Sequence, residues 1–275
     1  MTTCQSQEKP PVHGKVHLLA RAIAAHGSLD RWNTFNKVTA TVVAGGGLLP
    51  MKGLEADTNP LEVTVTLHEE SASISPFGQP DWRMAFTPDR VAIETTAGTI
   101  VRERSNPRAS FAGHIMNTPW DLLHRAYFNG YARWTYLTTP FLTAMPGFEV
   151  AEISPWQEGG ELWRGTQSGG LCGARGSRTR SPAIAKNRTS TSATISSCAG
   201  TTTTSTWRAD VLDKSALYPA AQYVYDIVEA DGLRFPSRVP IHRARRRAYL
   251  RGPHLKPIRD LLMVTIDLSN FRLMA

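Results

Sequence analysis

Alternating apolar and polar residues predict a series of short β-strands. The clearest pattern covers residues 61–67, where four aliphatic side chains alternate with polar ones, as in a strand with one buried face. Turn residues at Pro88-Asp89 and Gly98 leave only short connections, which favours antiparallel pairing. Further strands are predicted at 38–42, 71–75, 81–86, 90–95, 99–104, 148–153, 223–228 and 263–268.

Elsewhere the apolar residues recur with a helical period. One helix is predicted from Lys15 to the His26-Gly27 pair, and Ser28 is suited to cap a second, short helix. Helices followed by antiparallel strands indicate the α+β class, with a curved antiparallel sheet and helices at its N-terminal side.

A longer helix is predicted over residues 119–139. Thr118 has the side chain of an N-cap residue, and Pro119 fits the first helical position. We expect this helix to pack across one face of the sheet. Its aromatic residues are Trp120, Tyr127, Phe128, Tyr131, Trp134 and Tyr136.

Residues 166–217 differ in composition from the rest of the chain. They are rich in serine and threonine, and no acidic residue occurs between Glu161 and Asp210. One interpretation is a flexible linker, but no second domain of useful size follows it. We therefore expect a disordered lead at 1–13 and a single domain at 14–275, interrupted by this aberrant and disordered segment.

The genetic code offers a second interpretation of residues 166–210, namely translation in the wrong frame. When the last base of the preceding codon is read first, a TCN serine codon becomes one for Phe, Leu, Ile or Val. A threonine codon becomes one for Tyr, His, Asn or Asp. Alternating Thr and Ser is therefore what an alternating polar and apolar strand looks like out of frame. With suitable third bases, residues 181–210 become two strands joined by a Gly-Asp-Asp turn.

The formal net charge of +8 by itself suggests a nucleic-acid partner. Residues 167–210, however, contain six basic residues and one acidic residue, so they carry five of these eight charges. We therefore do not expect nucleic acid as a partner. No apolar run has the length of a membrane-spanning helix or a signal peptide, so a cytoplasmic protein is expected. Cys4, Cys172 and Cys198 lack metal or redox spacing, and we expect no metal and no cofactor.

Several stretches carry a resemblance to a known family. ARAIAAHGSLDRWNTF at 20–35 resembles the A-x-x-A-H-G-G-L-x-x-W opening of an uncharacterised actinobacterial family, and 118–142 and 219–238 look similar to the same family. More distantly, the opening resembles the LolA/LppX class of lipoprotein carriers. That resemblance implies an incomplete β-barrel with helices across its mouth and an apolar cavity for a lipid. The chain departs from the class in lacking an export signal and in having Ser28 where a second glycine is usual.

The aromatic helix is the first candidate for a functional site, because Tyr and Trp combine an apolar body with a polar tip. A half-barrel cavity for a lipid or another apolar small molecule would be lined by it, although a core helix packed on the sheet is an alternative interpretation. The ligand-binding residues predicted are Trp120, Tyr127, Phe128, Tyr131 and Trp134.

Two other functions are carried as alternatives. His114, Asp121 and His124 lie close in sequence and contain the groups of an acid–base or metal site. The basic run at 238–251 contains the side chains of a nucleic-acid patch, which would need aromatic residues or a recognition helix nearby. A solvated strand and loop is the favoured interpretation of this run. A binding protein is favoured over an enzyme.

Overall fold

The computed structural model of the chain describes residues 15–56, 58–146, 148–152, 174–178, 189–193, 201–203, 220–243 and 262–275. The predicted lead at 1–13 lies outside these ranges, and so does most of the aberrant segment.

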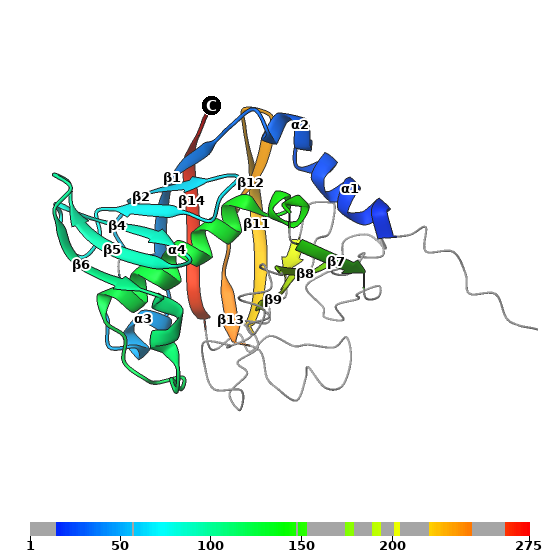
Figure 1. The fold of residues 1–275 in the computed structure, drawn as a ribbon. Coiled ribbons are helices and arrows are strands. Elements are labelled where there is room, and N and C mark those ends of the chain that lie inside the picture. The colour runs from blue at the N-terminus through cyan, green and yellow to red at the C-terminus, as the bar shows by residue number, and fades with distance from the viewer. Residues whose placement is uncertain are drawn as a thin grey trace, which may run out of the picture.

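The main sheet is antiparallel throughout and is not closed into a barrel. Its strand order is β10-β11-β12-β14-β1-β2-β3-β4-β5-β6, and β13 pairs with β11 and β14 (Figure 1). From β1 to β6 each strand pairs with its neighbour in sequence. The connections between β2 and β6 are short, whereas residues 46–60, which include the helix Leu48–Met51, connect β1 to β2. The strands are β1 (Lys37–Gly45), β2 (Leu61–Thr66), β3 (Ala72–Ser75), β4 (Trp82–Thr87), β5 (Arg90–Thr95), β6 (Ile100–Ser105), β10 (Thr201–Thr203), β11 (Ala220–Ala230), β12 (Leu233–Arg238), β13 (Ile241–Arg243) and β14 (Leu262–Met274).

A small second sheet has the order β7-β8-β9 and is also antiparallel. It joins β7 (Phe148–Glu152) to two strands within the segment of unusual composition, β8 (Ala174–Arg178) and β9 (Thr189–Ala193).

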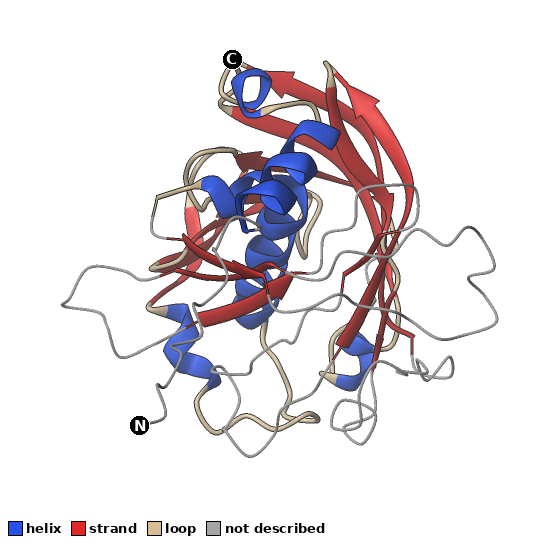
Figure 2. Cartoon of the chain, turned by 90° about the vertical axis from the view of Figure 1, so that its right-hand side faces the viewer, coloured by secondary structure: helices blue, strands red, loops and turns tan. Residues whose placement is uncertain are grey.

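One long helix, α4, packs across the main sheet, whose strands bend around it (Figure 2). This arrangement confirms the predicted α+β fold with a curved, unclosed antiparallel sheet. None of the described helices combines the length and apolarity needed to cross a membrane. The helices are α1 (Lys15–Ala25), α2 (Leu29–Trp32), α3 (Leu48–Met51) and α4 (Leu122–Thr138), with 3-10 turns η1 (Pro107–Phe111) and η2 (Phe141–Ala144).

The core lies between α4 and the inner face of the sheet. Along β2 the buried residues alternate as predicted: Leu61, Val63 and Val65 point into the core, and Glu62 is exposed. The long helix adds Ala126 and other side chains of its own to the same cluster. The buried residues of the strands, which alternate along each strand, and the apolar side of α4 therefore pack into one continuous core.

The start of α4 differs from the prediction. Asp121, not Thr118, is the N-cap, and the helix begins at Leu122. The hydroxyl of Thr118 instead accepts a hydrogen bond from the Ile115 N–H (2.9 Å), and the Trp120 N–H donates to the Lys52 carbonyl (2.9 Å). These contacts hold the preceding residues outside the helix.

Candidate functional site

Close contact with the sheet fixes the rotation of α4 about its own axis. Gly130 lies so near Phe86 that a Cβ atom at this position would be 2.4 Å from the Phe86 Cβ. One turn later, the Trp134 indole N–H donates to the Thr66 carbonyl (3.0 Å). These two contacts fix which side of α4 faces the sheet.

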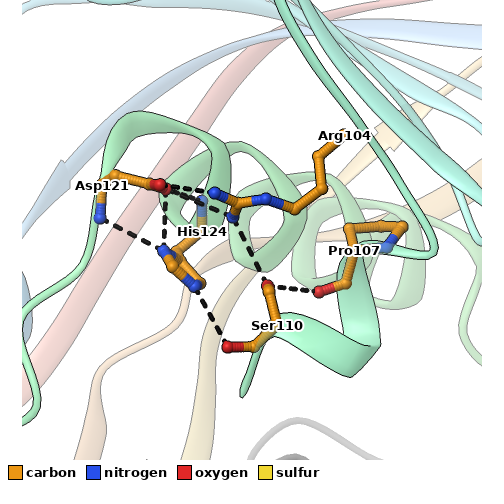
Figure 3. Close-up of polar contacts among 5 residues, drawn as sticks. All are labelled: Arg104, Pro107, Ser110, Asp121 and His124. Carbon is orange, nitrogen blue, oxygen red and sulfur yellow. Dashed lines mark hydrogen bonds and ion pairs between the residues drawn. The ribbon is translucent and has the colours of Figure 1, made fainter. Parts of the chain in front are cut away.

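A polar network surrounds the N-terminus of α4 (Figure 3). The Asp121 carboxylate accepts from the His124 backbone N–H (2.8 Å), and the His124 Nδ1 accepts from the Asp121 N–H (3.2 Å), which completes a capping box. Arg104 donates to Asp121 (2.5 Å) and to the Ser110 hydroxyl (3.4 Å), which itself donates to the Pro107 carbonyl (2.6 Å).

The candidate acid–base residues meet in this network. The rings of His114 and His124 have centroids 5.0 Å apart. Burial lowers the pKa of His114, and the nearby charges of His124 and Lys52 lower it further. Burial alone would raise the pKa of Asp121, but the hydrogen bonds from Arg104 and the His124 N–H place it below its ordinary value. Asp121 and His124 are thus occupied in capping the helix.

No metal-binding group of three or more His, Cys, Asp or Glu residues occurs in the described part of the chain. The carboxylate of this network is paired with Arg104, and His124 is paired with the backbone. The buried His114 Nδ1 has no hydrogen-bond partner among the described residues. The geometry of the network is that of a helix start.

The predicted aromatic residues separate into two groups. Trp134 is buried in the core, whereas the other four are half-buried. Trp120 precedes the helix and packs against Phe128, with ring centroids 5.2 Å apart. Its indole Nε1 is buried and has no hydrogen-bond partner among the described residues. Tyr127 packs edge-on against Phe86 at 5.5 Å, and burial raises its pKa to about 12. Tyr131 packs on the edge of the core.

Three cationic side chains that the sequence analysis did not identify are buried on α4 or near it: Lys52, Arg125 and Arg133. The Lys52 ammonium donates to the carbonyls of Ile115 (3.3 Å) and Met116 (2.5 Å). The Arg125 guanidinium lies over the Phe77 ring, 4.9 Å from its centroid. The sequence could have indicated the buried arginines, because a helix with apolar residues on most sides has no solvent-exposed side for its arginines.

A hollow of about 720 Å³ lies beside the first residues of β1, the middle of β2 and the last residues of β14. No residue of α4 lines it. Its walls include Thr39 and Thr64, whose hydroxyls share a hydrogen bond (3.1 Å), and the ion pair between Arg272 and Glu62 (2.8 Å). Lys37 and Asp231 also line the hollow.

The basic run is described only as far as Arg243. Arg238, its first residue, forms ion pairs with Asp267 (3.3 Å) and Asp226 (3.5 Å). The arginines at 245–251 lie outside the described residues.

Comparison with known proteins gives little beyond these observations. No family model matches the chain, and no curated protein matches it. Among solved structures it is similar to a DUF1329 family protein from Desulfovibrio piger, with 10% sequence identity and a TM-score of 0.31 over 93% of this chain and 91% of that chain. A likeness at this level carries no argument about function.

Proposed function

We propose that the protein binds an apolar small molecule or a lipid against the aromatic start of α4. The observation that carries this proposal is Trp120, whose buried indole N–H has no partner among the described residues. A buried Trp N–H normally finds an acceptor. A ligand with an apolar body and one polar end would supply that acceptor and would pack against Trp120 and Phe128.

The rest of the fold supports a binding role. The sheet is not closed, and a helix with half-buried rings lies across it. Proteins that hold apolar ligands use this combination of aromatic walls and a few polar groups. The His114, Asp121 and His124 group supports an enzyme less well, because two of its three members cap α4.

Binding of a neutral apolar fluorophore, N-phenyl-1-naphthylamine, tests the proposal. We expect saturable binding to the full chain and a loss of about 10-fold in affinity for Phe128→Ser, in line with the removal of one buried aromatic ring. Phe271→Ser is the matched control, because Phe271 lines the hollow that α4 does not touch. Equal binding by the two variants, or no saturable binding at all, would contradict the proposal.

A further inference from the structure

The main sheet is split between β12 and β14 at one end. Among the described residues, the ladder between these strands has a single Cα pair, Arg238 with Asp267. Beyond this pair β14 continues along β1 as far as Met274, whereas β12 pairs with β11. Figure 1 shows the turn between β11 and β12 and the end of β14 at the same end of the sheet. The two strands therefore leave a gap in the hydrogen-bonded sheet there.

The hollow of about 720 Å³ lies at this split. Asp231, in the turn before β12, lines it together with Lys37 of β1 and Phe271 of β14. The Phe271 ring stacks on Phe235 of β12, with ring centroids 5.0 Å apart, so two aromatic rings connect the strands across the split. Sites for small molecules have volumes of about 300–1,000 Å³. The hollow is therefore large enough for a ligand.

Two of the four charged side chains that line the hollow have no counter-charge. Arg272 and Glu62 form an ion pair with each other (2.8 Å). Lys37 and Asp231 form no ion pair within the part of the chain that the structure describes. Arg31 donates to the backbone carbonyl of Asp231 (2.7 Å) and not to its carboxylate. The hollow thus presents one cation and one anion that are available to a ligand, on two different elements.

Thr39 and Thr64 add neutral polar groups to the hollow. Their hydroxyls share a hydrogen bond (3.1 Å), which uses the proton of one hydroxyl and leaves the proton of the other available. The pair can therefore donate to a carbonyl oxygen and accept from an N–H of a ligand. These are the two groups of a peptide bond.

The geometry points to a binding site for a short peptide with free termini, such as a tripeptide, in this hollow. Lys37 would pair with the C-terminal carboxylate, Asp231 with the N-terminal ammonium, and Phe271 would contact a side chain. A free amino acid fits less well, because it carries both charges on one carbon, whereas Lys37 and Asp231 are not within ion-pair distance of each other. An extended tripeptide separates its charges by about 10 Å. The site is distinct from the one proposed at α4, because no residue of α4 lines the hollow.

Blocked and unblocked forms of one tripeptide, alanyl-leucyl-alanine, test the site from the side of the ligand. We expect saturable binding of the form with free termini in isothermal titration calorimetry at low salt. Amidation of the C-terminus or acetylation of the N-terminus should each weaken binding about 5-fold, as for the loss of one solvent-exposed ion pair. Absence of saturable binding, or equal binding of all three forms, would overturn the inference.

Two variants assign each end of the peptide to its partner. Lys37→Met should weaken binding of the free tripeptide about 5-fold and leave binding of the amidated form unchanged. Asp231→Asn should do the same for the free and the acetylated forms. Asn is chosen because Asp231 has a φ of 49°, a conformation that Asn also adopts readily. A loss that is the same for free and blocked peptides would overturn the assignment of the ends.

Arg102→Met is the matched control, because it also removes an exposed cation but lies on β6, outside the hollow. It should bind the free tripeptide as the full chain does. Lys37 and Asp231 are exposed, so their variants should unfold at the temperature of the full chain. If either unfolds lower, the comparison of free and blocked peptides on the full chain still decides the inference. N-phenyl-1-naphthylamine should not displace the tripeptide, and displacement would contradict two separate sites.

Discussion

The arginines at the start and in the middle of α4 have different surroundings. At the start, Arg104 is paired with Asp121 at 2.5 Å, and the carboxylate also caps the helix. In the middle, Arg133 is buried more deeply and has no carboxylate among the described residues. The comparison teaches that the cation at the start of α4 has its own counter-charge, whereas the described residues supply none for Arg133.

The largest expected effect concerns the contact that holds the middle of α4 on the sheet. Gly130→Val should lower the free energy of unfolding by about 3 kcal/mol, because the new side chain would overlap Phe86. Urea unfolding measures the change. Gly47→Ala is the control, since a Cβ there meets its nearest atom at 3.7 Å, and it should stay within about 0.5 kcal/mol. Equal stability of the two variants would mean that α4 can shift freely.

A second variant would give the middle of α4 a carboxylate beside its arginine, as at the start of the helix. Asn129→Asp places a carboxylate one helical turn from Arg133, so the unfolding free energy should rise by about 2 kcal/mol at pH 7. Asn129→Leu, which adds no charge, should not produce that rise. A destabilised Asn129→Asp would contradict the view that Arg133 lacks a counter-charge.

The start of α4 should depend on Asp121 itself. Asp121→Ala removes the cap and the partner of Arg104, and should cost about 1 kcal/mol. Thr118→Ala is the informative control, because the sequence predicted Thr118 as the cap and the structure places it before the helix. A larger loss for Thr118→Ala than for Asp121→Ala would overturn the assignment of the cap.

The smallest effect is the pH dependence of the same contact. The pKa of Asp121 is lower in the folded protein than its ordinary value of 3.8. The stabilisation is therefore complete above pH 4 and is lost as the pH falls through the folded pKa. Asp121→Asn should show a weaker decline in melting temperature between pH 4 and pH 2. An identical decline in both proteins would exclude Asp121 as a contributor.

Alternation was enough to predict the first six strands and the existence of α4, because short turns and period-two burial leave little freedom there. β12 was missed, although Asp231 and Gly232, both at positive φ, form the kind of turn that joins hairpin strands. The position of Pro236 within that strand obscured its pattern. The buried arginines were missed because sequence periodicity shows which side of a helix is apolar and not what covers its other sides.

The strands near the two ends of the main sheet also differ in how much of their apolar surface is buried. On β5, Val91, Ala92 and Ile93 are fully buried, so both faces are covered. On β11, the adjacent residues Ile227 and Val228 are 43% and 38% exposed, so neither face is covered at that point. Exposed apolar strand residues of this kind favour aggregation.

We propose that residues 166–210 are translated out of frame and that the intended strands would cover β11. The gene sequence tests this directly: the serines near Thr189 and Thr191 should use TCN codons, and AGY codons there would contradict the idea. The protein with the restored frame should be more soluble than this chain. Equal solubility of the two proteins would contradict the proposal.

The most direct test of the central claim is the state of the Trp120 indole N–H when an apolar ligand with one polar end is added. In protein labelled with ¹⁵N at its tryptophan side chains, the NMR signal that is missing from Trp120→Phe belongs to this group. Dodecanol should shift that signal, because its hydroxyl would accept a hydrogen bond from the indole N–H. A Trp120 signal that stays unchanged as dodecanol is added to saturation would contradict the account.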